Sequence, residues 1–179
     1  MQSVEQVGIS FNPGNGSGSA CVIELGTPST SGGQFPATSA TTVYPANGQT
    51  GVPITYLTAS ELPQVPVASS YPQMGQPIVV SLYSLANSAL TANKLSVQSF
   101  SLHQGSASGT AVAATVLAAA GVTSAANLTL TTDVNLAQPG MVVLVPNAPL
   151  AASTTYYVQI SATVNGSSVT NAWSFTTGA

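Results

Sequence analysis

The stretch TYYVQISATVNGSSVTNAWSFT, residues 155–176, decides the fold of this chain. Its first part, 155–164, alternates apolar and polar side chains, which is the period of a β-strand with one buried face. Asn165 and Gly166 follow, and this dipeptide favours a tight turn between antiparallel strands. The second part, 169–176, is again rich in β-forming residues. The stretch therefore predicts a β-hairpin.

The alternation also predicts which side chains of the hairpin are buried. One face of the first strand carries apolar side chains: Tyr156, Val158, Ile160 and Ala162. The opposite face carries Tyr157, Gln159, Ser161 and Thr163. Trp173 and Phe175 share one face of the second strand. We assign Trp173, Phe175 and the first set to the core, an assignment that a one-residue slip of register would reverse.

Further strand-like segments precede the hairpin and are separated by turn residues: 78–83, 95–102, 109–117, 127–130 and 141–145. No helical period survives the Thr, Val and Gly content, apart from an ambiguous Ala-rich run at 111–120. Seven short strands in about 100 residues are typical of an antiparallel β-sandwich of the immunoglobulin-like type. We therefore predict an all-β, immunoglobulin-like β-sandwich.

The first third of the chain has a different character, because nine of the 12 prolines lie within residues 1–77. Proline cannot donate to a sheet ladder, so central strands are expected after Pro77. Val7, Ile9 and Phe11 alternate before a Gly-rich turn, and 20–25 is a second candidate strand. We predict the following organisation: a β-hairpin at 1–26, a linker at 27–42, and the sandwich at 43–179 with a Pro-rich irregular lead-in at 43–77. The core of the sandwich is then expected to lie wholly after Pro77.

The charge content excludes several classes of function. Only 3% of the 179 residues are charged, with one Lys or Arg in the whole chain. Nucleic acids and anionic membrane surfaces are bound by clustered Lys and Arg, so neither is an expected partner. No run of 18 apolar residues is present, and membrane insertion is not expected either. The first residues lack the basic start and apolar core of a signal peptide, so we expect the native protein to continue upstream.

The chain also lacks the residues of a recognisable catalytic or metal site. It has one histidine, His103, one cysteine, Cys21, and four scattered acids. A metal needs three or four ligands at suitable spacing, and a catalytic base needs an orienting partner, for which Asp133 is the nearest acid in sequence. We interpret His103 as a structural residue at a strand end and Cys21 as a small buried side chain. We predict no enzymatic activity and no catalytic, cofactor-binding or metal-binding residues.

Several motifs together resemble a known family. They are VYPANGQTGVP (43–53), SELPQVP (60–66), GQPIVVSL (75–82) and the segment from 145 to 178. This ordered set is similar to the C-terminal region of secreted bacterial proteins of the CAP superfamily (cysteine-rich secretory, antigen 5 and pathogenesis-related), in which an SCP-like domain precedes a bacterial Ig-like domain. The most specific part is 143–177, with Leu150, Thr155, Tyr156, Trp173, Phe175 and Thr176. The opening segment 7–26 resembles the last two strands of the CAP domain itself.

The resemblance implies an exported, non-catalytic accessory module, secreted or at the bacterial cell surface, with an adjoining CAP domain as its partner. The CAP cavity belongs to the missing upstream part, and His103 lies in the Ig-like half, so no CAP site residue carries over. A binding module for a glycan or a protein is the alternative, with these tyrosines as its candidate surface: Tyr44, Tyr56, Tyr71 and Tyr83. We expect the hairpin 1–26 to pack on 43–77, or else to self-associate through its unpaired edge.

Overall fold

A computed structural model describes residues 9–11, 21–23, 40–56, 66, 73–83, 94–134, 136 and 140–179. The chain divides into two compact units, 1–38 and 39–179. In the first unit, β1 (Ile9–Phe11) pairs antiparallel with β2 (Cys21–Ile23), and Ile9 lies opposite Ile23. This pairing confirms the two strands expected from the alternation. Val7 and the intervening Gly-rich loop lie outside the described residues.

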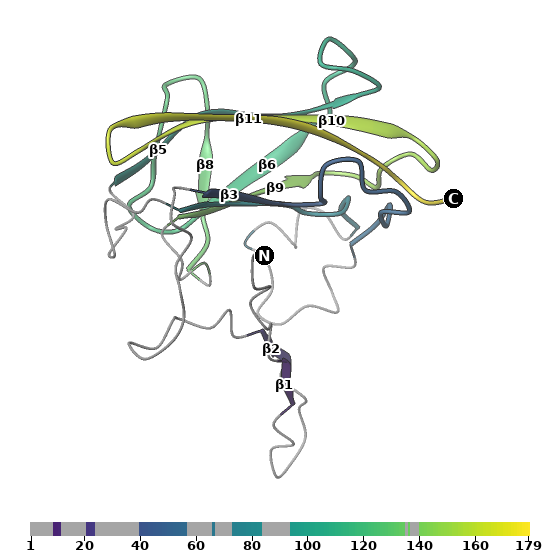
Figure 1. Ribbon diagram of the computed structural model, residues 1–179, viewed down its shortest axis with the longest axis horizontal. Helices are drawn as coiled ribbons and strands as arrows, with labels where there is room; N and C mark the ends of the chain where they lie inside the picture. The colour runs from purple at the N-terminus through teal and green to yellow at the C-terminus, as the bar shows by residue number, and fades with distance from the viewer. Residues whose placement is uncertain are drawn as a thin grey trace, which may run out of the picture. The chain divides into compact units, whose positions relative to one another are not determined.

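The second unit consists of two sheets stacked face to face (Figure 1). The four-stranded sheet has the order β11-β10-β5-β7 and the five-stranded sheet the order β3-β4-β9-β6-β8. The strands of the first sheet are β5 (Leu95–Gln104), β7 (Thr123–Ser124), β10 (Thr155–Val164) and β11 (Ser167–Thr176). Those of the second are β3 (Ala40–Tyr44), β4 (Ile78–Tyr83), β6 (Ala114–Ala118), β8 (Leu130–Thr132) and β9 (Met141–Pro146).

This strand order is that of an immunoglobulin-like domain. In chain order, β3, β4, β5, β6, β9, β10 and β11 take the places of strands A to G, so that one sheet reads ABED and the other CFG. The short strands β7 and β8 add to these sheets by parallel pairing with β5 and β6. The predicted immunoglobulin-like β-sandwich is therefore confirmed.

The β10–β11 hairpin forms in the predicted register. Tyr156 lies opposite Phe175 and Val158 opposite Trp173, without a shift along the ten pairs. The turn places Asn165 at φ 52° and Gly166 at φ 81°, the left-handed values that a two-residue hairpin turn requires. All of the residues that we assigned to the core are buried, with Trp173 and Tyr156 each 3% exposed, whereas Gln159 is exposed.

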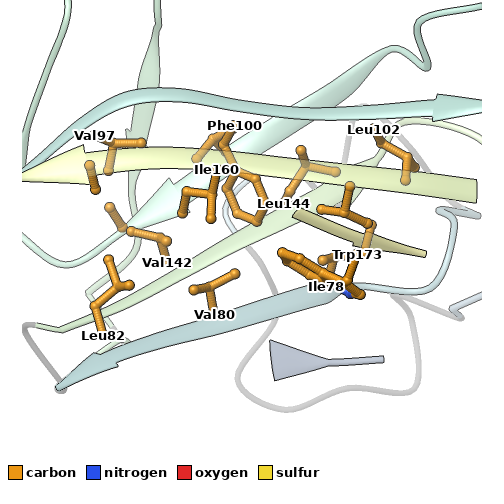
Figure 2. Close-up of a cluster of buried hydrophobic side chains, with 14 of the residues drawn as sticks. Ile78, Val80, Leu82, Val97, Phe100, Leu102, Val142, Leu144, Ile160 and Trp173 are labelled. Atoms are coloured by element: carbon orange, nitrogen blue, oxygen red, sulfur yellow. The ribbon is translucent and has the colours of Figure 1, made fainter. Parts of the chain in front are cut away.

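The core lies between the two sheets (Figure 2). Alternate residues of β4 and β9, among them Val80 and Leu144, face Phe100 of β5 and Ile160 of β10. Such burial stabilises the fold by about 25 cal/mol for each Å² of apolar surface removed from water. Within the described part of the chain, no helix has the length and apolarity needed to span a membrane.

The core also reaches further towards the N-terminus than the sequence indicates. Val52 and Met74 are fully buried, so the expectation that all core residues follow Pro77 is wrong. β3 begins at Ala40, inside the segment predicted to be a linker, and pairs with β4 so that Tyr44 lies opposite Val79. This segment joins the sandwich because its prolines remove only their own backbone N–H groups. The N–H and C=O groups of the other residues still form hydrogen bonds with the strands. Val52 N–H, for example, donates to the carbonyl of Thr176 at 3.2 Å.

Two predicted strands are displaced clearly from their predicted positions, while several others differ by one or two residues at an end. The segment predicted as 109–117 forms a strand only from Ala114, because residues 105–113 form the connection between the two sheets, in which Gly109 N–H donates to Ser106 O. The segment predicted as 127–130 forms β8 at Leu130–Thr132 instead, since Leu128 N–H bonds to Ala125 O in a turn. The Ala-rich run at 111–120 contains a strand and not a helix.

Candidate functional site

The outer face of the four-stranded sheet carries two rows of uncharged and mostly polar side chains. In one row Ser161 of β10 lies between Ser99 of β5 and Thr170 of β11. In the next row Gln159 lies between Ser101 and Ala172. Because side chains alternate across a strand, these residues point away from the core that their neighbours Ile160 and Trp173 fill. The two rows therefore form one continuous patch, which we call the hydroxyl face.

A β-bulge in β5 builds part of this face. The β5–β10 register shifts between Ser161, which pairs with Ser99, and Ala162, which pairs with Val97, so Gln98 is an extra residue. Val97 and Ser99 are two residues apart, so strict alternation of side chains along β5 would place Ser99 on the same buried face as Val97. The bulge reverses the alternation, so that Gln98 and Ser99 are both exposed and Phe100 is buried. Gln98 Nε2 donates to Ser96 Oγ at 3.0 Å beside the bulge.

The hydroxyl face is hollowed into an open depression with a volume of about 470 Å³. Short side chains such as Ser99, Ser161 and Ala172 line it, and the adjacent row contains the larger pair His103 and Tyr157. None of the lining residues is charged. Hydroxyl and amide groups both donate and accept hydrogen bonds. The depression is therefore suited to contact with a neutral polar partner.

The match to a family model covers the strands that form this face. Residues 73–177, more than half of the chain, match the model described as "Bacterial Ig-like domain". The chain belongs to this bacterial Ig-like family. The matched region runs from the approach to β4 to the end of β11, and leaves out β3 and residues 45–56, which the structure places in the same sandwich. None of the curated proteins matches the chain.

The Ig-like domain contains a hydrogen bond that sequence reasoning missed. The Tyr156 hydroxyl, at the start of β10, accepts a hydrogen bond of 2.8 Å from Ala151 N–H. A tyrosine in this position, bonded back to the backbone a few residues upstream, is the tyrosine corner of immunoglobulin-like folds. The Tyr156 ring also stacks on Phe175, with ring centroids 5.7 Å apart. The sequence carries a signal for this bond, which is the position of Tyr156 a few residues after Pro149-Leu150.

His103 and Asp133 are placed on different sheets of the Ig-like domain. His103 lies near the end of β5, and its Nδ1 is 3.0 Å from the carbonyl oxygen of Gly109, so the ring bonds to the backbone of the following turn. Asp133 follows β8 of the other sheet, is 5% exposed, and donates its own N–H to Ala118 O. His103 therefore lies near a strand end, as predicted, and its structural role stays a prediction.

The remaining candidate residues are only partly described. Cys21 lies in β2, but the structure describes only its backbone. Among the residues that the structure describes, no group of three or more His, Cys, Asp and Glu could hold a metal ion. The absence of catalytic, cofactor and metal residues remains a prediction.

The aromatic residues of the Ig-like domain have distinct positions. Trp173 is buried, and its Nε1 donates to Pro45 O at 2.9 Å, so it is a core residue and not an exposed platform. Tyr44 is 41% exposed at the end of β3, and Tyr56 is half-buried and forms a bridge with Met74. The side chains of Tyr71 and Tyr83 lie outside the described residues. The exposed Tyr44 belongs to the five-stranded sheet, on a different sheet from the hydroxyl face.

Proposed function

We propose that this Ig-like domain is a non-catalytic accessory module of an extracellular bacterial protein and makes contacts through its hydroxyl face. The observation that carries the proposal is that Ser99, Ser161 and Thr170 lie side by side across three strands on the outer face of the sheet. None of the residues that line this face is charged. Domains of this family are generally non-catalytic and typically occur in extracellular or surface proteins of bacteria. A neutral hydroxyl surface forms hydrogen bonds whose strength depends little on ionic strength, which suits a module exposed to a variable medium.

We propose further that the module is joined to a CAP domain in the native protein. Support comes from the likeness of residues 7–26 to the last two CAP strands, and from the order of the motifs that follow. The antiparallel pairing of β1 and β2 is consistent with this origin. In this arrangement the Ig-like domain holds or presents the CAP domain outside the cell.

Mass spectrometry of the native protein tests both proposals together. The culture supernatant, the cell wall fraction and the cytoplasm are separated, and bands that contain peptides from 1–179 are sequenced completely. We expect the protein in the supernatant or wall fraction, with peptides of a CAP domain in the same band. A cytoplasmic protein would contradict the extracellular role. An exported protein without CAP sequence would contradict only the attachment.

A binding module for a glycan or a protein is the second candidate, and the depression on the hydroxyl face favours it. Two surfaces can be compared directly by substitution. Gln159→Ala removes the longest side chain of the depression, and Tyr44→Ala removes the exposed aromatic ring of the other sheet. Binding to a glycan array or to isolated cell walls that is lost in Gln159→Ala and kept in Tyr44→Ala assigns the site to the hydroxyl face. Loss in Tyr44→Ala alone assigns it to the Tyr-bearing surface.

A further inference from the structure

One half of the outer edge of β11 is covered by another segment of the same domain. Residues 47–52 run along its C-terminal half, where Gly48 N–H donates to Ser174 O at 2.7 Å and Thr176 N–H donates to Gln49 O at 2.8 Å. Asn47 Oδ1 accepts from Ser174 N–H at 3.3 Å. Every backbone group that Ser174 and Thr176 direct away from β10 is therefore paired.

In the part of the chain that the structure describes, no segment covers the N-terminal half of the same edge in this way. Backbone direction alternates along a strand, so Ser168, Thr170 and Ala172 point their N–H and C=O groups away from β10 like Ser174. All three residues are exposed. Among the described residues, no backbone segment pairs with these groups. Within the described residues the bond to these groups is local: Ala172 N–H donates to Asn171 Oδ1 at 2.9 Å.

This free edge lacks the usual protection against strand addition. Natural edge strands carry Lys, Pro or a bulge that prevents another strand from pairing. Residues 167–172 contain neither Lys nor Pro, and the β10–β11 register has no bulge over its ten pairs. The whole stretch after Asp133 is free of charged side chains, so two copies meet there without charge repulsion.

We propose that the free edge of β11, residues 168–172, binds the same edge of a second copy of this chain in antiparallel fashion, centred on Thr170. This register places Thr170 opposite its symmetry mate and Ser168 opposite Ala172 of the second copy, so that outward donors face outward acceptors. It also places Ser174 of the second copy opposite Gly166, one residue before β11 begins. The covering segments 47–52 therefore lie outside the five paired residues, beside the hairpin turn of the other copy.

Asn171 limits the strength of this pairing. Its side chain occupies the Ala172 N–H, which is one of the donors that the second copy would use. Four of the six backbone hydrogen bonds of the pair can form without displacing Asn171, and two cannot. A pairing of five residues buries little surface, so the dimer is weak and depends on concentration. In the dimer, the two four-stranded sheets become one sheet with a shared hydroxyl face. This dimer does not depend on the accessory role proposed above.

Sedimentation velocity of the full chain over a range of concentrations tests the pairing. Thr170→Pro removes an outward N–H without touching the bonds to β10, and an edge strand tolerates proline in this orientation. We expect a concentration-dependent dimer for the wild type and a monomer for Thr170→Pro. Asn171→Ala releases the Ala172 N–H in both copies, and two more hydrogen bonds should lower the dimer dissociation constant about tenfold.

Two lysine variants test the pairing in case Thr170→Pro affects folding. Thr170→Lys places like charges across the two-fold axis and should abolish the dimer. Ser161→Lys introduces the same charge on the same face one strand away from the edge, and should keep the dimer. A wild-type chain that stays monomeric at all concentrations would overturn the proposal. So would a dimer that survives both Thr170 variants, which would assign self-association to another surface such as the hairpin at 1–26.

Discussion

The indole Nε1 of Trp173 donates a hydrogen bond of 2.9 Å to the carbonyl oxygen of Pro45, a residue 128 positions earlier in the chain. This bond joins the last strand of the sandwich to the segment that follows its first strand. It satisfies the only polar atom of a buried indole, which would otherwise be left without a partner on desolvation. The segment after β3 is therefore part of the domain's structure, although its prolines suggest an irregular lead-in.

Substitutions at Trp173 should separate packing from hydrogen bonding. Trp173→Ala is expected to lower the free energy of unfolding by about 3–5 kcal/mol, as truncation of a large buried aromatic does. Trp173→Phe keeps much of the apolar volume and loses the bond to Pro45 O, so a smaller loss is expected. Urea unfolding followed by circular dichroism measures both. Equal losses for the two variants would mean that the hydrogen bond, and not the packing, dominates.

The tyrosine corner provides a matched pair of adjacent residues. Tyr156→Phe removes the hydroxyl that accepts Ala151 N–H and should cost about 1–3 kcal/mol, the range for an unpaired buried group. Tyr157→Phe removes a hydroxyl from the opposite face of the same strand and should cost less than about 0.5 kcal/mol. Thermal unfolding of the two variants compares them. A larger loss for Tyr157→Phe would contradict the assigned faces.

The hairpin turn is expected to depend on its glycine. Gly166 has φ 81°, where an added Cβ meets no neighbour but the backbone is strained for any L-residue. Gly166→Ala should therefore lower the free energy of unfolding by about 1 kcal/mol. The control is Ser167→Ala, at an exposed position just after the turn. A loss of similar size in the control would show that the effect is not due to the left-handed conformation.

Truncation tests where the Ig-like domain begins. The fragment 39–179 contains β3 and the buried Val52, so it should unfold cooperatively with the melting temperature of the full chain. The fragment 73–179 begins where the family match does and lacks both, so a large loss of stability or a failure to fold is expected. Differential scanning calorimetry of the two fragments distinguishes these outcomes. A stable 73–179 fragment would show that the first strand is dispensable, and an unstable 39–179 fragment that residues 1–38 belong to the sandwich.

Much of the fold was predictable because it depends on local patterns. The alternation of Tyr156, Val158 and Ile160 determines the buried face of β10, and the Asn165-Gly166 dipeptide determines the turn. Both signals are carried by neighbouring residues, so no tertiary information is needed to read them. The bounds of β4 and β10 agree with the prediction for the same reason.

The features that escaped prediction all depend on partners that are distant in sequence. Val97, Ser99 and Ser101 alternate in the sequence of β5, and only the mismatch with β10 at Ser161 forces the bulge that exposes Ser99. Val52 is buried because its backbone bonds to Thr176 at the other end of the domain. The hydroxyl face itself is assembled from three strands whose small polar residues are unremarkable in each strand alone.

The sequence by itself determined the fold class and the last hairpin with its buried face. These properties follow from composition and from side-chain periods along one segment, which do not require knowledge of the neighbouring strands. The tertiary structure decided the remainder: the place of β3 and residues 45–52 in the sandwich, the hydroxyl face, and the free half of the β11 edge. Each of these depends on which backbone groups meet across the sheet, and hydrogen bonds between distant segments leave no periodic signal in the chain that forms them.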